Sequence, residues 1–190
     1  RNTAPAIVIS ALKALEKGEE PLLLILSADH NIKDIDQFLF VVEKARKYAE
    51  DGKIVTFGII PSSPETGFGY IQSSEILAQE FQASSITKFL EKPDLNTAKK
   101  LIKDKRFYWN SGIFLAKAST LIREANKYCK GLTSLCQDSL NAKLYDLDFQ
   151  RLEAETFKKC PDISIDKAIM EKTDIGMVIP LKAGWSDIGS

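Results

Sequence analysis

The stretch Leu22-Leu23-Leu24-Ile25-Leu26-Ser27-Ala28-Asp29-His30 decides the fold class of this chain. Its five consecutive apolar residues, bounded by Pro21 and Ser27, are typical of a strand that is buried on both faces. A carboxylate, Asp29, stands where this strand ends. In open α/β sheets, ligands collect outside the carboxyl ends of the strands. The position leaves two interpretations open: Asp29 holds a divalent cation against substrate phosphates, or it only starts a turn.

Helical and strand patterns alternate outward from this stretch. We expect helices from Thr3, which can act as the N-cap, from Asp34 or Asp36, after Asp94, over 121–157 with polar breaks, and from Ser164. We expect further strands over 54–60, after the turn formers of 62–71, over 86–90, over 108–116 and over 175–181. Such alternation predicts an α/β fold with a mainly parallel sheet. The absence of a linker pattern predicts a single domain over residues 1–190.

The composition excludes several classes of protein. Lysine and arginine number 26, as do aspartate and glutamate, so the formal net charge is zero. A neutral chain without a basic stripe is poorly suited to nucleic acid, whose binding depends on neutralising many phosphates. The longest apolar run, Leu22–Leu26, is far too short to span a bilayer. No basic segment followed by an apolar one opens the chain, so we expect no signal peptide and no membrane partner.

The cysteines and the single histidine limit the chemistry further. Cys129, Cys136 and Cys160 are odd in number and lack the paired spacing of a zinc site, so we expect reduced thiols in a cytoplasmic protein. His30 is the only histidine, which excludes any mechanism that needs a pair of histidines.

Three polar motifs break the apolar pattern later in the chain. Asp187 lies in a loop between Gly184 and Gly189, where glycines allow close approach of a ligand, although an Asp in this setting is usually a turn residue. Glu91-Lys92-Pro93 ends a strand, and its Glu can accept from sugar hydroxyls while its Lys meets a phosphate, or the two form a surface ion pair. Asn110-Ser111-Gly112 places polar groups inside an apolar strand, so it needs a partner in protein, water or ligand.

Two Asp-x-Asp patterns also occur, Asp34-Ile35-Asp36 and Asp146-Leu147-Asp148. In sugar-nucleotide glycosyltransferases such a pair binds metal and diphosphate. Here each pattern precedes a helical run, so we interpret both as helix caps rather than metal sites.

Eight motifs, in this order, together carry a resemblance that the separate motifs do not. They are Arg1-Asn2-Thr3-Ala4-Pro5-Ala6-Ile7, Ser27-Ala28-Asp29-His30, Thr56-Phe57-Gly58-Ile59, Pro64-Glu65-Thr66-Gly67-Phe68-Gly69-Tyr70-Ile71, Phe89-Leu90-Glu91-Lys92-Pro93, Trp109-Asn110-Ser111-Gly112-Ile113-Phe114, Ser164-Ile165-Asp166-Lys167-Ala168-Ile169-Met170-Glu171-Lys172 and Gly184-Trp185-Ser186-Asp187-Ile188-Gly189. From Arg1 to Ser190 the chain resembles the bacterial mannose-1-phosphate guanylyltransferases of the sugar-1-phosphate nucleotidyltransferase family.

The resemblance implies a fold and a reaction. The fold is the Rossmann-like, GT-A-like nucleotidyltransferase sandwich of three layers. The reaction transfers GMP from GTP to α-D-mannose 1-phosphate, giving GDP-mannose and pyrophosphate, with Mg²⁺ as cofactor. GTP and mannose 1-phosphate are thus the expected partners, in polysaccharide biosynthesis, and a homodimer is a family expectation only.

The resemblance also assigns roles to eight residues. It implies that Asp29 and Asp187 bind the metal and act in catalysis, and that Lys92 meets the sugar phosphate as a third catalytic residue. The expected nucleotide-binding residues are Asn2 and Thr3, and the expected sugar-binding residues are Gly69, Glu91 and Asn110.

The chain departs from the family pattern in one important respect. Ser27, Phe68 and Lys167 replace a usual Pro, a common Tyr and a common aromatic residue, which are mild changes. Nothing matches the Gly-rich phosphate loop that opens the family's domain, so we expect that loop and the first strand to lie upstream of Arg1. Without them, the chain alone is expected to bind nucleotide poorly and not to turn over.

Three hypotheses remain open from the sequence. The first is a cytoplasmic guanylyltransferase or another sugar-1-phosphate nucleotidyltransferase. The second is a regulatory or structural subunit of the same fold that keeps a sugar pocket. The third is an Asp-x-Asp glycosyltransferase, which predicts loss of function when Asp34 or Asp36 is changed.

Overall fold

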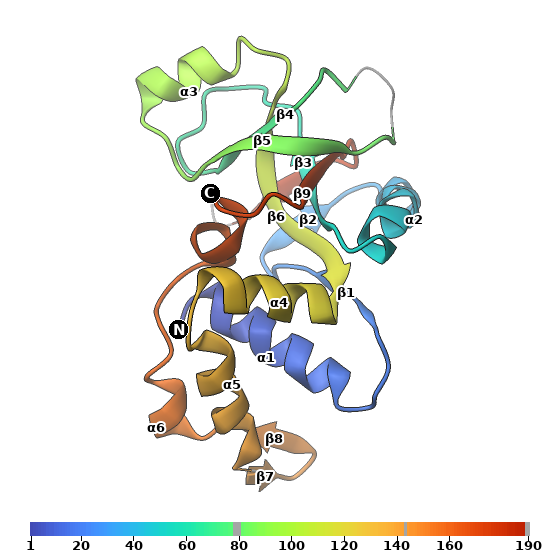
Figure 1. Ribbon diagram of the computed structural model, residues 1–190. Coiled ribbons are helices and arrows are strands. Elements are labelled where there is room, and N and C mark those ends of the chain that lie inside the picture. Colours follow the sequence, from blue (N-terminus) through green and yellow to red (C-terminus); the bar gives the residue numbers. More distant parts are fainter. Residues whose placement is uncertain (78–80, 143, 189–190) are drawn as a thin grey trace. The chain divides into compact units, whose positions relative to one another are not determined.

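The computed structural model describes residues 1–77, 81–142 and 144–188 of the chain (Figure 1). Gly189, which closes the last motif, lies outside these residues. The chain divides into two compact units, each made of two separate segments. Residues 1–21 and 118–173 form the helical unit, and residues 22–117 and 174–190 form the sheet unit. The prediction of a single domain over 1–190 stays a prediction.

The helical unit is built around α1 (Thr3–Leu15), α4 (Ala118–Tyr128) and α5 (Leu132–Asn141). Helix α1 packs against both of the others (Figure 1). Its apolar residues recur with helical spacing, so Val8 and Ala11 are fully buried, as are Leu121 of α4 and Leu132 of α5. The unit is completed by β7 (Leu144–Asp146), β8 (Phe149–Arg151), α6 (Ala154–Phe157) and the π-helix η1 (Asp166–Met170).

The sheet unit contains a six-stranded sheet in the order β1-β6-β3-β9-β5-β4. The strands are β1 (Leu22–Ile25), β3 (Ile54–Ile59), β4 (Tyr70–Ser73), β5 (Ser84–Leu90), β6 (Phe107–Lys117) and β9 (Gly176–Pro180). Strand β4 also pairs with β6, so β6, β3, β9, β5 and β4 form a closed ring of pairings. Trp109 of β6 marks the junction, because it pairs with Ile59 of β3 and with Tyr70 of β4.

Helix α2 (Ile35–Glu50) supplies the main core of the sheet unit. Phe38, Val41 and Ala45 lie on one face of α2 and pack with buried sheet residues that include Phe57 and Ile113. Full burial of a large apolar side chain contributes about 1.5–3 kcal/mol, so this face fixes α2 on the sheet. A second cluster places Tyr70 and Trp109 beside α3 (Leu95–Leu101).

A small two-stranded sheet joins distant parts of the sheet unit. Strand β2 (His30–Ile32) pairs antiparallel with β10 (Trp185–Asp187). The backbone N–H groups of Lys33 and Asp34 both donate to the carbonyl oxygen of Ala183, at 3.0 Å each, which extends this connection. Across the described residues, no helix is long and apolar enough to cross a membrane.

The predicted α/β class is confirmed, but the direction of the strands is not. Only the β3–β9 pairing is parallel among the described strand pairs, and the sheet is mixed with mostly antiparallel pairings. The prediction of a mainly parallel sheet assumed a helical crossover between successive strands. Strands β4 and β5 instead follow each other without a helix and pair directly, and β6 runs antiparallel to three neighbours.

Other sequence predictions need correction at the level of single elements. Strand β1 forms as predicted, but it ends the strand order and its residues are half-buried rather than buried on both faces. Residues 144–151 form a β-hairpin inside the stretch predicted as helical. Asn2, rather than Thr3, caps α1, since its side-chain oxygen accepts from the Thr3 N–H at 2.9 Å.

The two Asp-x-Asp patterns have different structural roles. Asp34 caps α2 as predicted, accepting from the Gln37 N–H at 2.9 Å. Asp146 caps no helix; it lies in the hairpin and forms an ion pair with Arg151 at 2.6 Å. The capping interpretation is therefore right for the first pattern and wrong for the second.

Candidate functional site

The β2–β10 pair brings together two carboxylates that are far apart in the sequence. Asp187 stands opposite His30 in the register, and the N–H of Ile188 donates to the carbonyl oxygen of Asp29 at 2.9 Å. Asp29 and Asp187 thus occupy neighbouring backbone positions on adjoining segments. The first is exposed and the second is half-buried.

Two neighbouring carboxylates fit the way Mg²⁺ usually binds. This ion keeps several waters and takes one or two carboxylates together with substrate phosphates, rather than a closed cage of protein ligands. In the part of the chain that the structure describes, no group of three or more His, Cys, Asp or Glu side chains is placed to hold a metal ion. The two carboxylates at the β2–β10 pair are the number that a site of this kind takes from the protein, and their binding of a metal stays a prediction.

The three residues predicted to hold a sugar converge at one place in the same unit. Gly69 immediately precedes β4, Glu91 follows β5, and Asn110 belongs to β6, so the pairing of β4 with both neighbours gathers them. The N–H of Asn110 donates to the carbonyl oxygen of Gly69 at 2.8 Å. A Cβ atom on Gly69 would lie 2.8 Å from Oε2 of Glu91 and 3.4 Å from Cβ of Asn110. The carboxylate of Glu91 therefore closes over the backbone at Gly69.

A β-bulge sets the position of Asn110. Opposite β3, the register shifts so that Thr56 pairs with Phe114 while Gly58 pairs with Asn110. Gly112 lies inside this bulge with a φ of +71°, a left-handed value that glycine adopts without strain. The hydroxyl of Thr56 lies 3.0 Å from Oδ1 of Asn110, so the expected partner of this polar motif is a protein side chain.

Lys92 follows Glu91 in an unusual backbone conformation. Its φ is +47°, in the left-handed region, and its side chain is exposed. Such a conformation costs a residue with a side chain about 1–3 kcal/mol and often marks a functional site. The following Pro93 disfavours the ordinary helical conformation at Lys92, which is one local cause.

A row of aromatic rings that the sequence analysis missed adjoins these residues. Phe68, next to Gly69, contacts Trp109 and Trp185 edge-on, with ring centroids 5.3 and 5.4 Å apart. Trp185 in turn contacts His30 at 5.2 Å. The rings therefore run from the neighbour of Asn110 to the strand that carries Asp187. No spacing rule points to them, because the four residues come from four separate segments.

Burial controls the ionisation of a phenol beside the sugar-site residues. Tyr70 is fully buried, and burial raises the pKa of its phenol above the usual range. Its hydroxyl donates to the carbonyl oxygen of Glu65 at 2.8 Å, which ties the start of β4 to the preceding loop. Tyr70 is therefore a neutral structural donor at physiological pH.

Asn2 and Thr3 belong to the helical unit, where their side chains have structural partners. Asn2 caps α1, and its backbone N–H donates to the carboxylate of Asp162 at 3.1 Å. The hydroxyl oxygen of Thr3 accepts from the N–H of Ile165 at 2.9 Å. Both residues thus connect the start of α1 to the segment before η1, and their nucleotide-binding role stays a prediction.

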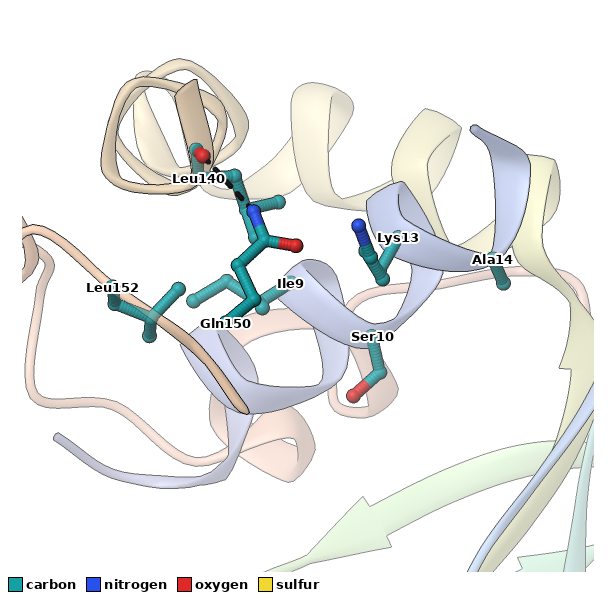
Figure 2. A pocket seen from close by; sticks show the side chains of 7 residues that line it. All are labelled: Ile9, Ser10, Lys13, Ala14, Leu140, Gln150 and Leu152. Carbon is teal, nitrogen blue, oxygen red and sulfur yellow. Dashed lines mark hydrogen bonds between the residues drawn. The ribbon is translucent and has the colours of Figure 1, made fainter. Parts of the chain in front are cut away.

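The helical unit also contains a cavity of about 580 Å³ (Figure 2). Its lining is mostly apolar and comes from α1, the end of α5 and the region of β8: Ile9, Ser10, Lys13, Ala14, Leu140, Gln150 and Leu152. Figure 2 shows the amide of Gln150 donating to the carbonyl oxygen of Leu140, at 3.2 Å. None of the residues predicted to bind substrate or metal lines this cavity.

Comparison with known proteins places these features in a family. The nucleotidyl transferase family model matches residues 1–190. Among curated proteins, the chain is 46% identical over 194 residues to a mannose-1-phosphate guanylyltransferase of Escherichia coli K12 and 47% identical over 194 residues to one of Salmonella montevideo. Each match covers 100% of this chain and 41% of the relative, so the chain spans less than half the length of these proteins.

Two solved structures share the fold, and the chain covers a larger share of each of them than of the curated relatives. A structure described as mannose-6-phosphate isomerase from Helicobacter pylori is 33% identical with a TM-score of 0.86, over 98% of this chain and 70% of that one. A structure described as mannose-1-phosphate geranyltransferase from Thermus thermophilus is 29% identical with a TM-score of 0.84, over 100% of this chain and 52% of that one. These matches confirm the Rossmann-like α/β fold that the sequence predicts.

Proposed function

The chain belongs to the nucleotidyl transferase family, and from this premise we propose that its full-length protein transfers GMP from GTP to mannose 1-phosphate. The names of its curated relatives support this choice of substrates. One structural observation carries the proposal: a carboxylate pair, Asp29 and Asp187, and a group of polar residues around Gly69 lie in one unit, joined by a row of aromatic rings.

The proposed reaction requires the negative charges of its two phosphate-bearing substrates to be neutralised, and it does not require a general base. A phosphate oxygen of mannose 1-phosphate forms a bond to the α-phosphorus of GTP, while the bond from that phosphorus to the β-phosphate breaks and pyrophosphate leaves. A sugar phosphate is already mostly dianionic at neutral pH, because its second pKa lies near about 6. No proton has to be removed from the nucleophile, so a site with a single histidine suffices. The difficulty is to hold two anions in line.

Asp29 and Asp187 are proposed to hold Mg²⁺ at the β2–β10 pair. When bound, the ion neutralises phosphate charge and orients the reacting groups. The backbone of β10 fixes Asp187 opposite His30, while the hydrogen bond from Ile188 fixes the turn at Asp29. Hydrogen bonds between the two segments therefore hold the backbone positions of both aspartates.

The sugar and its phosphate are proposed to bind between Gly69, Glu91, Asn110 and Lys92. The carboxylate of Glu91 accepts hydrogen bonds from sugar hydroxyls, and Gly69, which has no Cβ atom, leaves the space that this carboxylate occupies. The ammonium group of Lys92 attracts the phosphate as a point charge. Asn2 and Thr3 are proposed to contact the guanine base through backbone or side-chain polar groups.

A pyrophosphate-release assay tests the proposal. The full-length protein is mixed with GTP, mannose 1-phosphate and Mg²⁺, and compared with the Asp187→Ala variant. We expect release to depend on mannose 1-phosphate and to fall at least about 100-fold in the variant, since charge-stabilising groups are worth that much in catalysis. Asp36→Ala, which removes an exposed carboxylate of α2, is the matched control and should retain activity.

Each alternative predicts a different outcome. An Asp-x-Asp glycosyltransferase would release no pyrophosphate from GTP; it would release a nucleotide from a sugar nucleotide, and Asp36→Ala would abolish that release. Release with another nucleotide or sugar phosphate would keep the family and change the substrates. No release from a folded wild-type protein with any of these substrates would favour a non-catalytic subunit.

A further inference from the structure

The cavity of about 580 Å³ in the helical unit has no role in the proposed reaction, because none of its lining residues is assigned to metal or substrate. Its walls are mostly apolar and include Ala14 of α1, Leu140 at the end of α5 and Leu152 after β8. Lys13 of α1 also lines it, and the ammonium group of Lys13 pairs with Glu16 at 2.5 Å. The cavity is therefore an apolar recess with a cation beside it.

The β7–β8 hairpin borders this recess and ends in an exposed apolar tip. Gln150 of β8 lines the recess and donates to the carbonyl oxygen of Leu140 at 3.2 Å, so the base of the hairpin forms one wall (Figure 2). At the other end of the hairpin, Leu147 is 90% exposed and Tyr145 is 69% exposed. Tyr145 pairs with Gln150 in the register, and directly opposite residues lie on the same face of an antiparallel pair. The exposed tyrosine thus belongs to the hairpin face that borders the recess.

The turn of the hairpin holds its leucine at a cost to the single chain. Asp146 and Phe149 are the last paired residues, so the turn consists of Leu147 and Asp148. Leu147 has a φ of +53°, a left-handed value at a position where two-residue turns favour glycine. The neighbouring carboxylate of Asp148 is exposed and has no partner in the part of the chain that the structure describes. Backbone strain that exposes an apolar side chain points to a contact outside the single chain.

We propose that the hairpin tip and the recess form a contact surface between two copies of this chain. Leu147 of one copy inserts into the apolar recess of the other, and Asp148 pairs with the Lys13 beside that recess. The exposed pair of Lys13 with Glu16 is weak, so Lys13 can exchange this partner. Tip and recess belong to one unit and adjoin one hairpin, so two copies can exchange them reciprocally, as a two-fold dimer requires.

Sedimentation velocity of the full-length protein over a range of concentrations tests this surface. The wild type should pass from monomer to dimer as its concentration rises. Leu147→Gly should weaken dimerisation at least about 100-fold, because two leucine side chains per dimer lose their burial. Glycine also suits the left-handed backbone, so the thermal unfolding midpoint of the monomeric variant should not fall below that of monomeric wild type. Leu39→Ala, which shortens a leucine of α2 that is 55% exposed, is the matched control and should dimerise as the wild type does.

Mixing two variants tests whether the tip of one copy enters the recess of the other. Ala14→Arg places a long charged side chain at the recess and should also abolish self-association. Leu147→Gly keeps an intact recess and Ala14→Arg keeps an intact tip, so their mixture should form a heterodimer with one complete contact. Lys13→Glu and Asp148→Lys should each weaken dimerisation, and the doubly reversed variant should recover it.

Several results would overturn the inference. A wild type that stays monomeric at its highest soluble concentration has no such contact. A dimer that persists in Leu147→Gly, or a mixture that forms no heterodimer, assembles through another surface. A lower unfolding midpoint of monomeric Leu147→Gly would mean that the tip contacts the remainder of its own chain. None of these measurements depends on pyrophosphate release, so the proposed function stands or fails separately.

Discussion

Gly69 shows how little space one position in the candidate site leaves. A Cβ atom there would lie 2.8 Å from the carboxylate of Glu91, a separation that real side chains essentially never show. We therefore expect Gly69→Ala to push Glu91 aside and to raise the KM for mannose 1-phosphate at least about tenfold, since the charge-assisted hydrogen bond proposed between Glu91 and the sugar would be lost. Steady-state kinetics with each substrate varied in turn measures this. The KM for GTP should change little.

Gly67 provides the matched control in the same loop. A Cβ atom on Gly67 would meet nothing within 4 Å, so Gly67→Ala should leave both KM values unchanged. Equal effects of the two substitutions would mean that the loop backbone, and not the contact with Glu91, explains the result.

The residues of the site divide into those that the sequence predicts and those that it cannot. Gly69, Glu91 and Asn110 carry recognisable motifs, and the structure brings them together, while their role in sugar binding stays a prediction. Thr56 precedes Asn110 by 54 positions, and only the bulge makes them partners. Phe68 likewise meets Trp109 and Trp185 through the fold alone. Partners across strands depend on register, which local sequence does not encode.

The turn between α3 and β6 should respond to acid. The Arg106 guanidinium and backbone N–H hydrogen-bond to Asp104 and lower the pKa of its carboxyl from 3.8 to about 2. Because this pKa is lowered on folding, the stabilising contribution is present above about 3.8 and is lost as the pH falls through about 2. Thermal unfolding midpoints should therefore differ between wild type and Asp104→Asn above pH 4 by a margin that disappears near pH 2.

Two controls distinguish this ion pair from general acid unfolding. Arg106→Gln should lose the same pH-dependent margin, since it removes the other partner. Asp51→Asn, which removes an exposed carboxylate at the end of α2, should follow the wild-type curve. Both Asp104 and Arg106 are solvent-accessible, so added salt should reduce the margin. A margin that persists at pH 2 would contradict the assignment.

Elements were predictable where one local rule was sufficient. The apolar runs at 22–26 and 54–60 form strands, and Asp34 and Asp94 cap helices. The hairpin at 144–151 was missed because its turn carries Leu147, with a φ of +53°, where glycine or asparagine would signal a turn. The predicted strand direction was wrong for a related reason. An apolar run indicates that a strand forms, but it does not indicate which strand pairs with it or in which direction.

At the scale of the whole molecule, the sheet unit joins its two chain segments where the candidate site lies. Strand β9 inserts between β3 and β5, while β10 pairs with β2, so residues after 174 complete both the sheet and the carboxylate pair. Phe68 contacts one tryptophan on each side of this arrangement, Trp109 beside Asn110 and Trp185 on the strand of Asp187. The chain has only these two tryptophans, so its intrinsic fluorescence reports on the site.

This arrangement predicts that each tryptophan senses a different substrate. In a Trp185→Phe variant, which leaves Trp109, mannose 1-phosphate should change the emission without Mg²⁺ or nucleotide. In a Trp109→Phe variant, which leaves Trp185, GTP with Mg²⁺ should change the emission, and removing the metal with EDTA should reverse it. Phe68 contacts both tryptophan rings. Phe68→Leu should therefore weaken the response of Trp109 to GTP with Mg²⁺ more than its response to mannose 1-phosphate. It should likewise weaken the response of Trp185 to mannose 1-phosphate more than its response to GTP with Mg²⁺. If neither tryptophan responds to ligands that calorimetry shows to bind, the substrates bind elsewhere, and the assignment of the site to this face of the sheet unit is wrong.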